Sequence, residues 1–292
     1  MKRRRRHKKF DFSLLLINVF LLLLTLITIF PLINILAVSL SSSTMASQVI
    51  FLPKGFTLQS YAYIISNKAF WRAAGISILR IIAGPSVNLL FAIFPAYALS
   101  KSSRQFRGRT IYAWIFFLST IFGGGVVPWF MMIRAAGLYN NFWGLIIPGA
   151  VAVGNIILLL NFFRQVPKEL EEAAIMDGAN HFRILLQIYL PVSKAAIATI
   201  LLFSIVGHWN GWFDGMVLMK DPEKYPLQTY LQAVVVKQPQ MSQSNVDWSV
   251  YDNISQKTTN AAQIFISILP MLIFYPFMQK YFVKGLVIGS VK

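Results

Sequence analysis

The sequence contains no cysteine, and this absence excludes several kinds of functional site. Without a thiol the chain has no disulfide framework, iron–sulfur cluster, thiolate zinc site or thiol nucleophile. Histidine is also scarce, since only His7, His181 and His208 occur and they lie far apart in the sequence. We therefore expect no catalytic residue, no metal site and no cofactor bound by this chain.

Charged residues are scarce as well. They make up 13% of the 292 residues, whereas soluble domains carry about 25%. Hydrophobic residues make up 56%, and the mean hydropathy is +0.60. Six apolar helices of roughly 20 residues each would leave room for loops but not for a large additional soluble domain. The composition therefore predicts an all-α integral membrane protein.

The chain also lacks the sequence elements that would let it supply its own energy. A phosphate-binding loop of the form G-x-x-x-x-G-K-[ST] is absent, because no Lys-Ser or Lys-Thr follows Gly123-Gly124-Gly125. Asp214 is the only acidic residue inside a predicted span, so a buried acid cluster that could relay protons or sodium is absent too. A transport function would therefore need an energy source on another subunit.

The hydropathy pattern predicts six transmembrane helices. The predicted spans are Leu14 to Val38, Gly75 to Leu99, Ile111 to Ile133, Phe142 to Phe163, Ala195 to Met219 and Ala261 to Phe282. The first span follows a basic run, as the core of a signal peptide does. It is longer than the 7 to 15 residues of such cores, so we expect an uncleaved span.

The basic residues predict the orientation of these spans. The segments on one side hold 18 of the 27 Lys and Arg residues, and the segments on the other side hold eight. By the positive-inside rule, the amino and carboxyl termini are both cytoplasmic. The net charge of +17 fits this orientation better than nucleic-acid binding, and the amino-terminal basic run could also contact anionic lipid. The long polar segments Ser39 to Ala74 and Lys220 to Asn260 are expected outside, where they could form small platforms.

The loop Arg164 to Lys194 is the only predicted cytoplasmic loop with substantial acidic content. Pro167 suits the first position of a helix, and the acidic residues that follow it suit the early turns. Gly178 is predicted to end this helix. The loop is too long for a simple turn, so it predicts more than one helix.

A second short helix is predicted after Asn180, which is a suitable cap. Its apolar residues recur at spacings of three and four between Phe182 and Leu190, at Phe182, Leu185, Leu186 and Tyr189. Pro191 is predicted to break it. The loop is thus expected to form a helix–turn–helix along the cytoplasmic membrane face.

This loop carries a resemblance to a known family. Glu172-Ala173-Ala174, three residues, Gly178, nine residues and Ile188-Tyr189-Leu190-Pro191 resemble the EAA loop of binding-protein-dependent ABC importer permeases. The pattern fixes seven positions over twenty residues, which makes it far more specific than a lone glycine turn. The alternative is an ordinary cytoplasmic loop with a solvated acidic face.

The resemblance extends from about Arg72 to the carboxyl end. Trp209-Asn210 and the ending from Gln279 to Gly285 resemble the carbohydrate-uptake, maltose-type branch. The run Gly207 to Asp214 is similar to permeases for complex oligosaccharides or polysaccharide fragments. Gly211 departs from the pattern, because many relatives carry an acidic residue at this position.

The resemblance implies a domain organisation and a coupling role. It implies a basic cytoplasmic tail at 1–11, the first helix and an external loop at 12–71, a permease core at 72–284 with the EAA loop at 164–194, and a cytoplasmic tail at 285–292. The loop would be a coupling helix that docks on a cytosolic ATPase. The residues expected to do this are Glu171, Glu172, Ala173, Ala174, Asp177, Gly178, Ile188, Leu190 and Pro191.

The resemblance also implies partners and a location. We expect a heterodimer with a second, related permease, two copies of a cytosolic ABC ATPase that binds ATP and magnesium, and an extracellular or periplasmic sugar-binding protein. The complex would lie in a bacterial plasma membrane and import oligosaccharide or polysaccharide-derived sugars. The alternatives are a different cargo such as amino acids, peptides or polyol phosphates, an ATP-independent secondary transporter, and a membrane-bound enzyme that uses Asp214 and His208.

Span five carries the candidates for a sugar path. Aromatic faces, amides and carboxylates recognise sugars, and these groups occur at His208, Trp209, Asn210, Trp212 and Asp214. The alternative is packing for Trp209 and an interfacial position for Trp212.

Arg80 could line a wet cavity or extend outward to the interface, and the second is favoured. Gly123 to Gly125 and Pro128 should weaken the outer half of span three, which predicts a broken or closely packed helix near the path. The alternative is that these small residues serve simple helix contact.

Overall fold

The computed structural model describes residues 12–236 and 256–290, and this part of the chain contains helices and loops but no strand. The predicted basic tail 1–11 lies outside the described residues. The same holds for residues 237–255 of the predicted outer segment and for the last two residues of the predicted tail 285–292. The prediction of an all-α membrane protein is confirmed.

The chain divides into two compact units. The first comprises residues 1–66 and 244–266, and the second comprises residues 67–243 and 267–292. In the first unit, α1 (Phe12–Ser39) is followed by η1 (Ser43–Gln48), α2 (Gln59–Ser66) and the first part of α13 (Gln256–Ser290). The apolar window of α1 has no buried residue, which is expected of a helix whose side chains face lipid.

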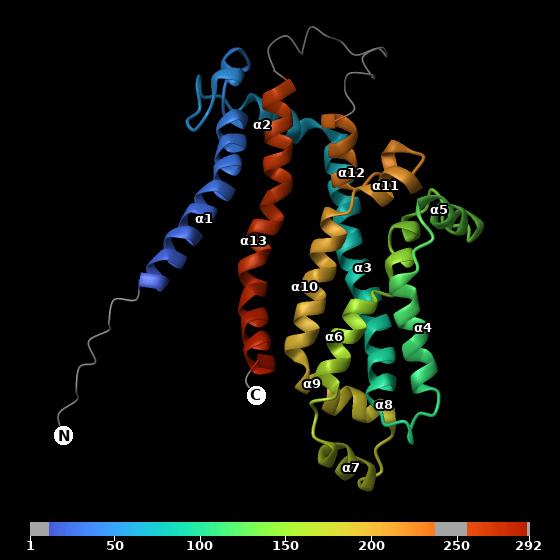
Figure 1. Cartoon of the computed structure of the whole chain (residues 1–292). Coiled ribbons are helices and arrows are strands. Elements are labelled where there is room, and N and C mark those ends of the chain that lie inside the picture. Colours follow the sequence, from blue (N-terminus) through green and yellow to red (C-terminus); the bar gives the residue numbers. More distant parts are fainter. Residues whose placement is uncertain (1–11, 237–255, 291–292) are drawn as a thin grey trace, which may run out of the picture. The chain divides into compact units, whose positions relative to one another are not determined.

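The second unit is built around α3 (Lys68–Ser100), shown in teal in Figure 1. Asn67 starts this helix, because its side chain accepts hydrogen bonds from the backbone N–H groups of Ala69 and Phe70. The helix packs mainly against α6 (Val153–Phe163) and α10 (Lys194–Asn210). Ala92 and Ala96 of α3 are buried in this core, where small side chains allow helix axes to approach closely.

The predicted third span is two helices in the structure. α4 (Arg109–Ile121) and α5 (Val126–Ala135) are separated at residues 122–125, where Gly125 has φ +77°. This confirms the prediction that the glycine run weakens the span, since a positive φ suits glycine and interrupts a helix. The predicted fifth span is also shorter than expected, because α10 ends at Asn210 and α11 (Phe213–Leu218) is a separate helix.

The remaining elements of the second unit are short. They are η2 (Phe142–Leu145), η3 (Ile147–Gly149), α7 (Lys168–Met176), α8 (His181–Ile184), η4 (Leu185–Tyr189), α9 (Leu190–Val192), η5 (Pro222–Lys224), α12 (Leu227–Leu231) and η6 (Gln232–Val236). Among them, η4 and η6 are π-helical turns.

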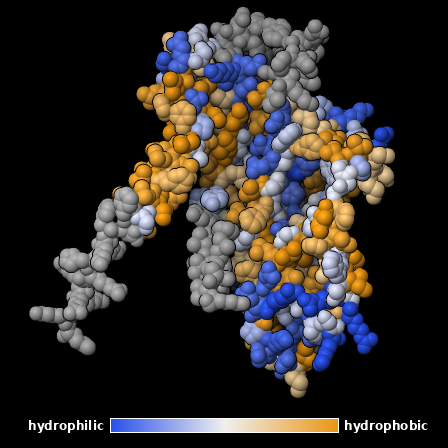
Figure 2. All heavy atoms as spheres, viewed as in Figure 1, coloured by the Kyte–Doolittle hydropathy of each residue, from blue (hydrophilic) through white to orange (hydrophobic). Residues whose placement is uncertain are grey.

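Several helices meet the requirements of a membrane span. Among the described residues, three are long and apolar enough, namely Ser13–Ser39, Lys68–Ser100 and Gln256–Pro276. Two bent helix pairs raise the number to five if each pair counts as one span: 142–149 with α6, bent by 50°, and 181–192 with α10, bent by 81°. Figure 2 shows hydrophobic residues over much of the α4 side of the second unit and hydrophilic residues concentrated at its α7 end.

Candidate functional site

The predicted acidic loop contains two short helical segments, which we call the elbow (residues 168–192). α7 begins directly after Pro167, one residue later than predicted, and the chain turns at Gly178 with φ +77°. Only glycine adopts this conformation without strain, so the turn depends on it. Asn180 caps the second segment as predicted, since its side-chain oxygen accepts a hydrogen bond from the N–H of Arg183 at 2.8 Å.

The second segment differs from the prediction at its end and on its buried face. It continues through Pro191 to Val192, because Pro191 lies at the start of α9, where its missing N–H is tolerated. Phe182 and Leu186 were predicted on the apolar face but are 59% and 46% exposed. The reason is that Ile184, Leu185 and Tyr189 pack into the core, so the buried face of the segment is rotated away from Phe182 and Leu186.

The elbow exposes most of the predicted coupling residues. Glu172, Ala173, Asp177, Gly178 and Pro191 are exposed, and Ala174, Ile188 and Leu190 are half-buried. Glu171 is different, because it is only 6% exposed. Its carboxylate is therefore not presented on the surface of the elbow.

Glu171 forms a buried ion pair with Lys101, the residue that directly follows α3. Lys101 Nζ lies 2.7 Å from Glu171 Oε1, and the hydroxyl of Tyr189 donates to Glu171 Oε2 at 2.6 Å. Lys101 also donates to the Tyr189 hydroxyl at 3.2 Å and lies over the Tyr97 ring, 4.0 Å from its centroid. This cluster, which we call the Lys101 pair, ties the end of α3 to both segments of the elbow.

The ionisation of the Lys101 pair follows from its burial and its contacts. Burial alone would raise the pKa of Glu171, but the hydrogen bonds from Lys101 and Tyr189 and the charge of Lys101 bring it below its ordinary value. Burial lowers the pKa of Lys101, and the neighbouring Glu171 carboxylate offsets only part of this effect. Glu171 is therefore a carboxylate at neutral pH, held in a fixed position.

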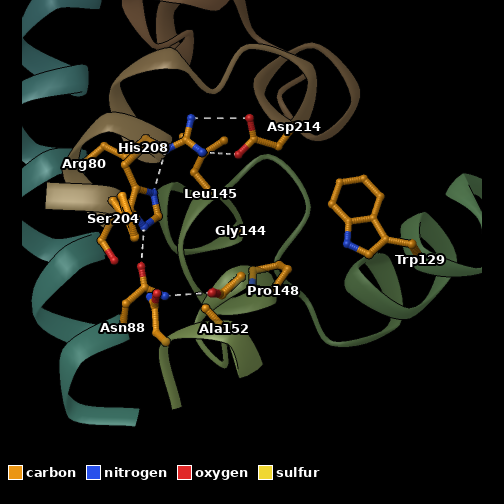
Figure 3. Close-up of a pocket in the computed structure, with 14 residues that line it drawn as sticks. Arg80, Asn88, Trp129, Gly144, Leu145, Pro148, Ala152, Ser204, His208 and Asp214 are labelled. Atoms are coloured by element: carbon orange, nitrogen blue, oxygen red, sulfur yellow. Dashed lines mark hydrogen bonds and ion pairs between the residues drawn. The ribbon is translucent and has the colours of Figure 1, made fainter. Parts of the chain in front are cut away.

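A second ion pair joins α3 to α11. The guanidinium of Arg80 contacts both carboxylate oxygens of Asp214 (Figure 3). It also donates to the carbonyl oxygen of Gly211 at 3.0 Å. Arg80 is only 3% exposed, so the favoured prediction that it extends outward to the interface is wrong. The physical reason is that the chain turns after α10 and brings the Asp214 carboxylate to the guanidinium. The ion pair offsets the cost of removing the charge from water. We call this contact the Arg80 pair.

His208 and Asn88 continue the network from the Arg80 pair. Arg80 Nε lies 3.4 Å from His208 Nδ1, and His208 Nε2 lies 2.9 Å from Asn88 Oδ1. Asn88 Nδ2 donates in turn to the carbonyl oxygen of Gly149 at 2.7 Å. A Cβ atom at position 84 would collide with the ring of His208, so Gly84 is what allows this ring to lie against α3.

The network borders a cavity of about 470 Å³. The wall combines residues from α3, α5, α6, α10, α11 and the 3₁₀ turns between α5 and α6. Its members are Arg80, Asn88, Trp129, Gly144, Leu145, Pro148, Gly149, Ala152, Asn155, Phe203, Ser204, Gly207, His208 and Asp214. The predictions of His208 and Asp214 thus coincide with the cavity, and Arg80 lines it as the alternative for this residue stated. Five other polar or aromatic members were missed, namely Asn88, Trp129, Asn155, Phe203 and Ser204.

The other three predicted path residues do not line this cavity. Trp209 is 4% exposed and donates through Nε1 to the carbonyl oxygen of Ser267 at 3.2 Å. It therefore packs in the protein interior, as the alternative to a sugar-path role predicted. Trp209 and Asn210 border a second cavity of about 270 Å³, next to α12 and α13. Trp212 is 41% exposed, and with Asn210 it borders an open cavity of about 750 Å³ beside Gly123 to Gly125. This cavity shares Arg80, Trp129 and Asp214 with the first one.

One sequence signal could have identified the Arg80 pair. Asp214 is the only acid in a predicted span, and Arg80 lies within another span. Because charges inside membranes usually pair with one another, these two residues could have been matched. The missed residues Trp129, Asn155 and Ser204 carry no comparable local signal.

Comparisons with known proteins place the chain in a family. It is 38% identical to protein LplC of Bacillus subtilis over 268 residues, which cover 91% of this chain and 90% of that protein. It is 33% identical to the polygalacturonan/rhamnogalacturonan transport system permease protein YtcP of the same organism, over 98% of this chain and 99% of that protein.

A solved structure agrees with these relatives. The chain matches a subunit in the crystal structure of a bacterial ABC transporter involved in the import of the acidic polysaccharide alginate. The TM-score is 0.86 at 34% identity, and the match covers 97% of this chain and 100% of that chain. No protein-family model matches the chain. From its relatives and its apolar helices, the protein is an integral membrane transport subunit that belongs to the ABC importer permeases of the carbohydrate-uptake branch.

Proposed function

We propose that this chain forms half of the membrane pathway of an importer for oligosaccharide or polysaccharide-derived sugars, with alternating access driven by a separate ATPase. The observation that carries the proposal is the elbow, which presents the family motif on its surface and is anchored to α3 by the Lys101 pair. Coupling requires a surface on which the ATPase can dock. It also requires a rigid connection from that surface to a membrane helix, and the elbow supplies both.

The proposed topology has six crossings, with the elbow and both termini in the cytoplasm. Three long helices, residues 142–163 and α10 would supply five crossings, and α4 with α5 would supply the sixth as a broken span. The excess of basic residues in the segments near the elbow supports this orientation. The segment limits 1–11, 12–71, 72–284 and 285–292 are part of this proposal.

The exposed surface of the elbow is the proposed docking site for the ATPase. Glu172 and Asp177 offer carboxylates there, while Ala173 leaves room for close approach. Apolar side chains adjoin them, with Met176 87% exposed and Phe182 59% exposed. Exposed apolar groups beside charged ones are typical of protein interfaces. Glu171 is proposed to position the elbow instead of touching the partner.

The cavity beside the Arg80 pair is the proposed part of the sugar path in this subunit. It offers polar groups and the Trp129 ring, which suit a hydroxylated ligand with apolar ring faces. The names of the relatives refer to polygalacturonan, rhamnogalacturonan and alginate, which supports a sugar cargo over amino acids or peptides.

The proposed assembly contains a second, related permease, two copies of a cytosolic ATPase that carries the ATP and magnesium, and an external sugar-binding protein. The family assignment supports these partners. The proposed site is the bacterial inner membrane, where lipid would surround α1 and the apolar face of α4.

The proposal is tested by sugar uptake and ATP hydrolysis in proteoliposomes that contain the whole complex. Glu172→Lys and Gly178→Asp should abolish uptake while leaving the complex inserted, because they alter the docking surface and the turn. Glu169→Lys is the matched control, since it reverses an exposed charge on the same helix outside the motif. Normal uptake by both motif variants would contradict the coupling role.

The same preparation separates the alternatives. Uptake of an amino acid, peptide or polyol phosphate in place of sugar would identify a different cargo. It would not contradict the coupling role of the elbow. Uptake driven by an ion gradient without the ATPase would instead identify a secondary transporter.

A further inference from the structure

Most polar side chains of the 470 Å³ cavity are already bonded to one another. The carboxylate of Asp214 neutralises the guanidinium of Arg80, and His208 is bonded to Asn88. These residues form a neutral and preorganised wall (Figure 3). The volume lies within the range of about 300 to 1,000 Å³ that is typical of small-molecule sites.

Ser204 of α10 also lines the cavity, but its hydroxyl is not part of this hydrogen-bonded network. The side chain is 7% exposed, and Oγ has no hydrogen-bond partner within the described residues. Thr199 on the same helix donates to the carbonyl oxygen of Ala195 at 2.9 Å, which is the usual solution for a hydroxyl in an apolar helix. A buried hydroxyl without a partner is unfavourable, so a ligand or a water that enters the cavity would be bound by it.

Asn155 and Trp129 are, with Ser204, the polar or indole side chains of the cavity that lie outside this network. Asn155 lies in the first turn of α6 and is half-buried, and its side-chain amide makes no hydrogen bond within the described residues. Trp129 comes from α5 and lies across the cavity from Ser204 in Figure 3. The cavity therefore offers one hydroxyl, one amide and one half-buried indole ring.

We propose that Trp129, Asn155 and Ser204 form a binding subsite for one pyranose ring of the transported sugar. A hydroxyl and an amide both donate and accept, as sugar hydroxyls require, and the indole face suits the C–H face of the ring. The wall is neutral, so the subsite contacts hydroxyl groups and needs no charge on the ring. This inference rests on the proposed function, because it names the ligand-contacting residues of the same path.

The test compares uptake kinetics of variants in the reconstituted complex with its binding protein and ATPase. Ser204→Ala and Asn155→Ala each remove one hydrogen bond and should raise the KM for uptake about threefold to tenfold. Trp129→Ala removes the indole ring and should raise the KM by about tenfold. Trp129→Phe keeps an aromatic ring and should bring the KM most of the way back.

Ser193→Ala is the matched control. Its hydroxyl is also buried and has no partner within the described residues, but it does not line the cavity. Its KM should match that of the unaltered protein. If the three cavity variants also match, or if Ser193→Ala raises KM equally, the subsite is overturned.

A binding measurement does not depend on folding of the alanine variants. Because the chain has no cysteine, Asn155→Cys introduces a single thiol into the cavity. Oligosaccharide should slow its reaction with a maleimide at least threefold, and equal rates with and without sugar would contradict the subsite. Absence of sugar uptake by the unaltered complex would instead contradict the proposed function, so the two failures are distinguishable.

Discussion

The two buried ion pairs on α3 have similar chemistry and different surroundings. In the Lys101 pair, the side chains are 7% and 8% exposed and aromatic rings cover the ammonium group. In the Arg80 pair, the arginine side chain is 4% exposed but Asp214 is 23% exposed and borders a cavity. One pair is enclosed by protein, and the other forms part of the wall of an open space.

The positions of the pairs explain this difference. Arg80 in α3 and Lys101 directly after its end are 21 positions apart, or about 32 Å at a rise of 1.5 Å per residue. This distance is close to the ~30 Å thickness of the hydrocarbon layer. The pairs thus lie near opposite ends of a membrane-spanning length of helix, which fits the proposed coupling joint at one end and the proposed sugar path at the other.

The largest effect is expected from breaking the Lys101 pair. Lys101→Ala or Glu171→Ala leaves the other charge buried without its partner, which should cost about 3 to 5 kcal/mol of stability. Thermal unfolding of the purified complex and the amount of ATPase retained on it measure this effect. The double variant Lys101→Met with Glu171→Leu should recover most of the stability, because both charges are removed together.

Removing the carboxylate of the Arg80 pair should have a smaller effect on stability. Asp214→Asn keeps the shape and a hydrogen-bond acceptor, and its partial exposure lets water solvate the guanidinium. We expect a loss of about 1 to 2 kcal/mol and a several-fold reduction in uptake. If Asp214→Asn is as damaging to stability as Glu171→Ala, the contrast between the two pairs is wrong.

The smallest effect is expected at the exposed pair Arg72–Glu223. Its charged groups lie 2.8 Å apart, but the side chains are 45% and 73% exposed. Pairs of this kind contribute about 0 to 1 kcal/mol, because water solvates both charges. Unchanged uptake and unchanged thermal unfolding of Arg72→Ala would show that burial, and not pairing alone, distinguishes the first two pairs from this one.

The elbow was predictable because its signals are local in the sequence. Gly178 needs a positive φ and Asn180 is a cap, and both properties act over a few residues. The break of the third span was predictable in the same way from Gly123 to Gly125.

The ion pairs depend on tertiary contacts that the sequence pattern did not reveal. Arg80 and Asp214 are 134 residues apart, and Lys101 and Glu171 are 70 apart. Glu171 and Glu172 are neighbours in the motif, yet one is buried and the other exposed, since successive helical residues point in different directions. The positions of Lys101 and Tyr189 in the fold distinguish them.

The most direct test of the central claim is the accessibility of the elbow from each side of the membrane. Asp177→Cys introduces one thiol at an exposed position of this cysteine-free chain. We predict that a membrane-impermeant maleimide leaves it unlabelled in intact cells, labels it after permeabilisation, and labels it more slowly when the ATPase is bound. Rapid labelling in intact cells would place the elbow outside and contradict its coupling role.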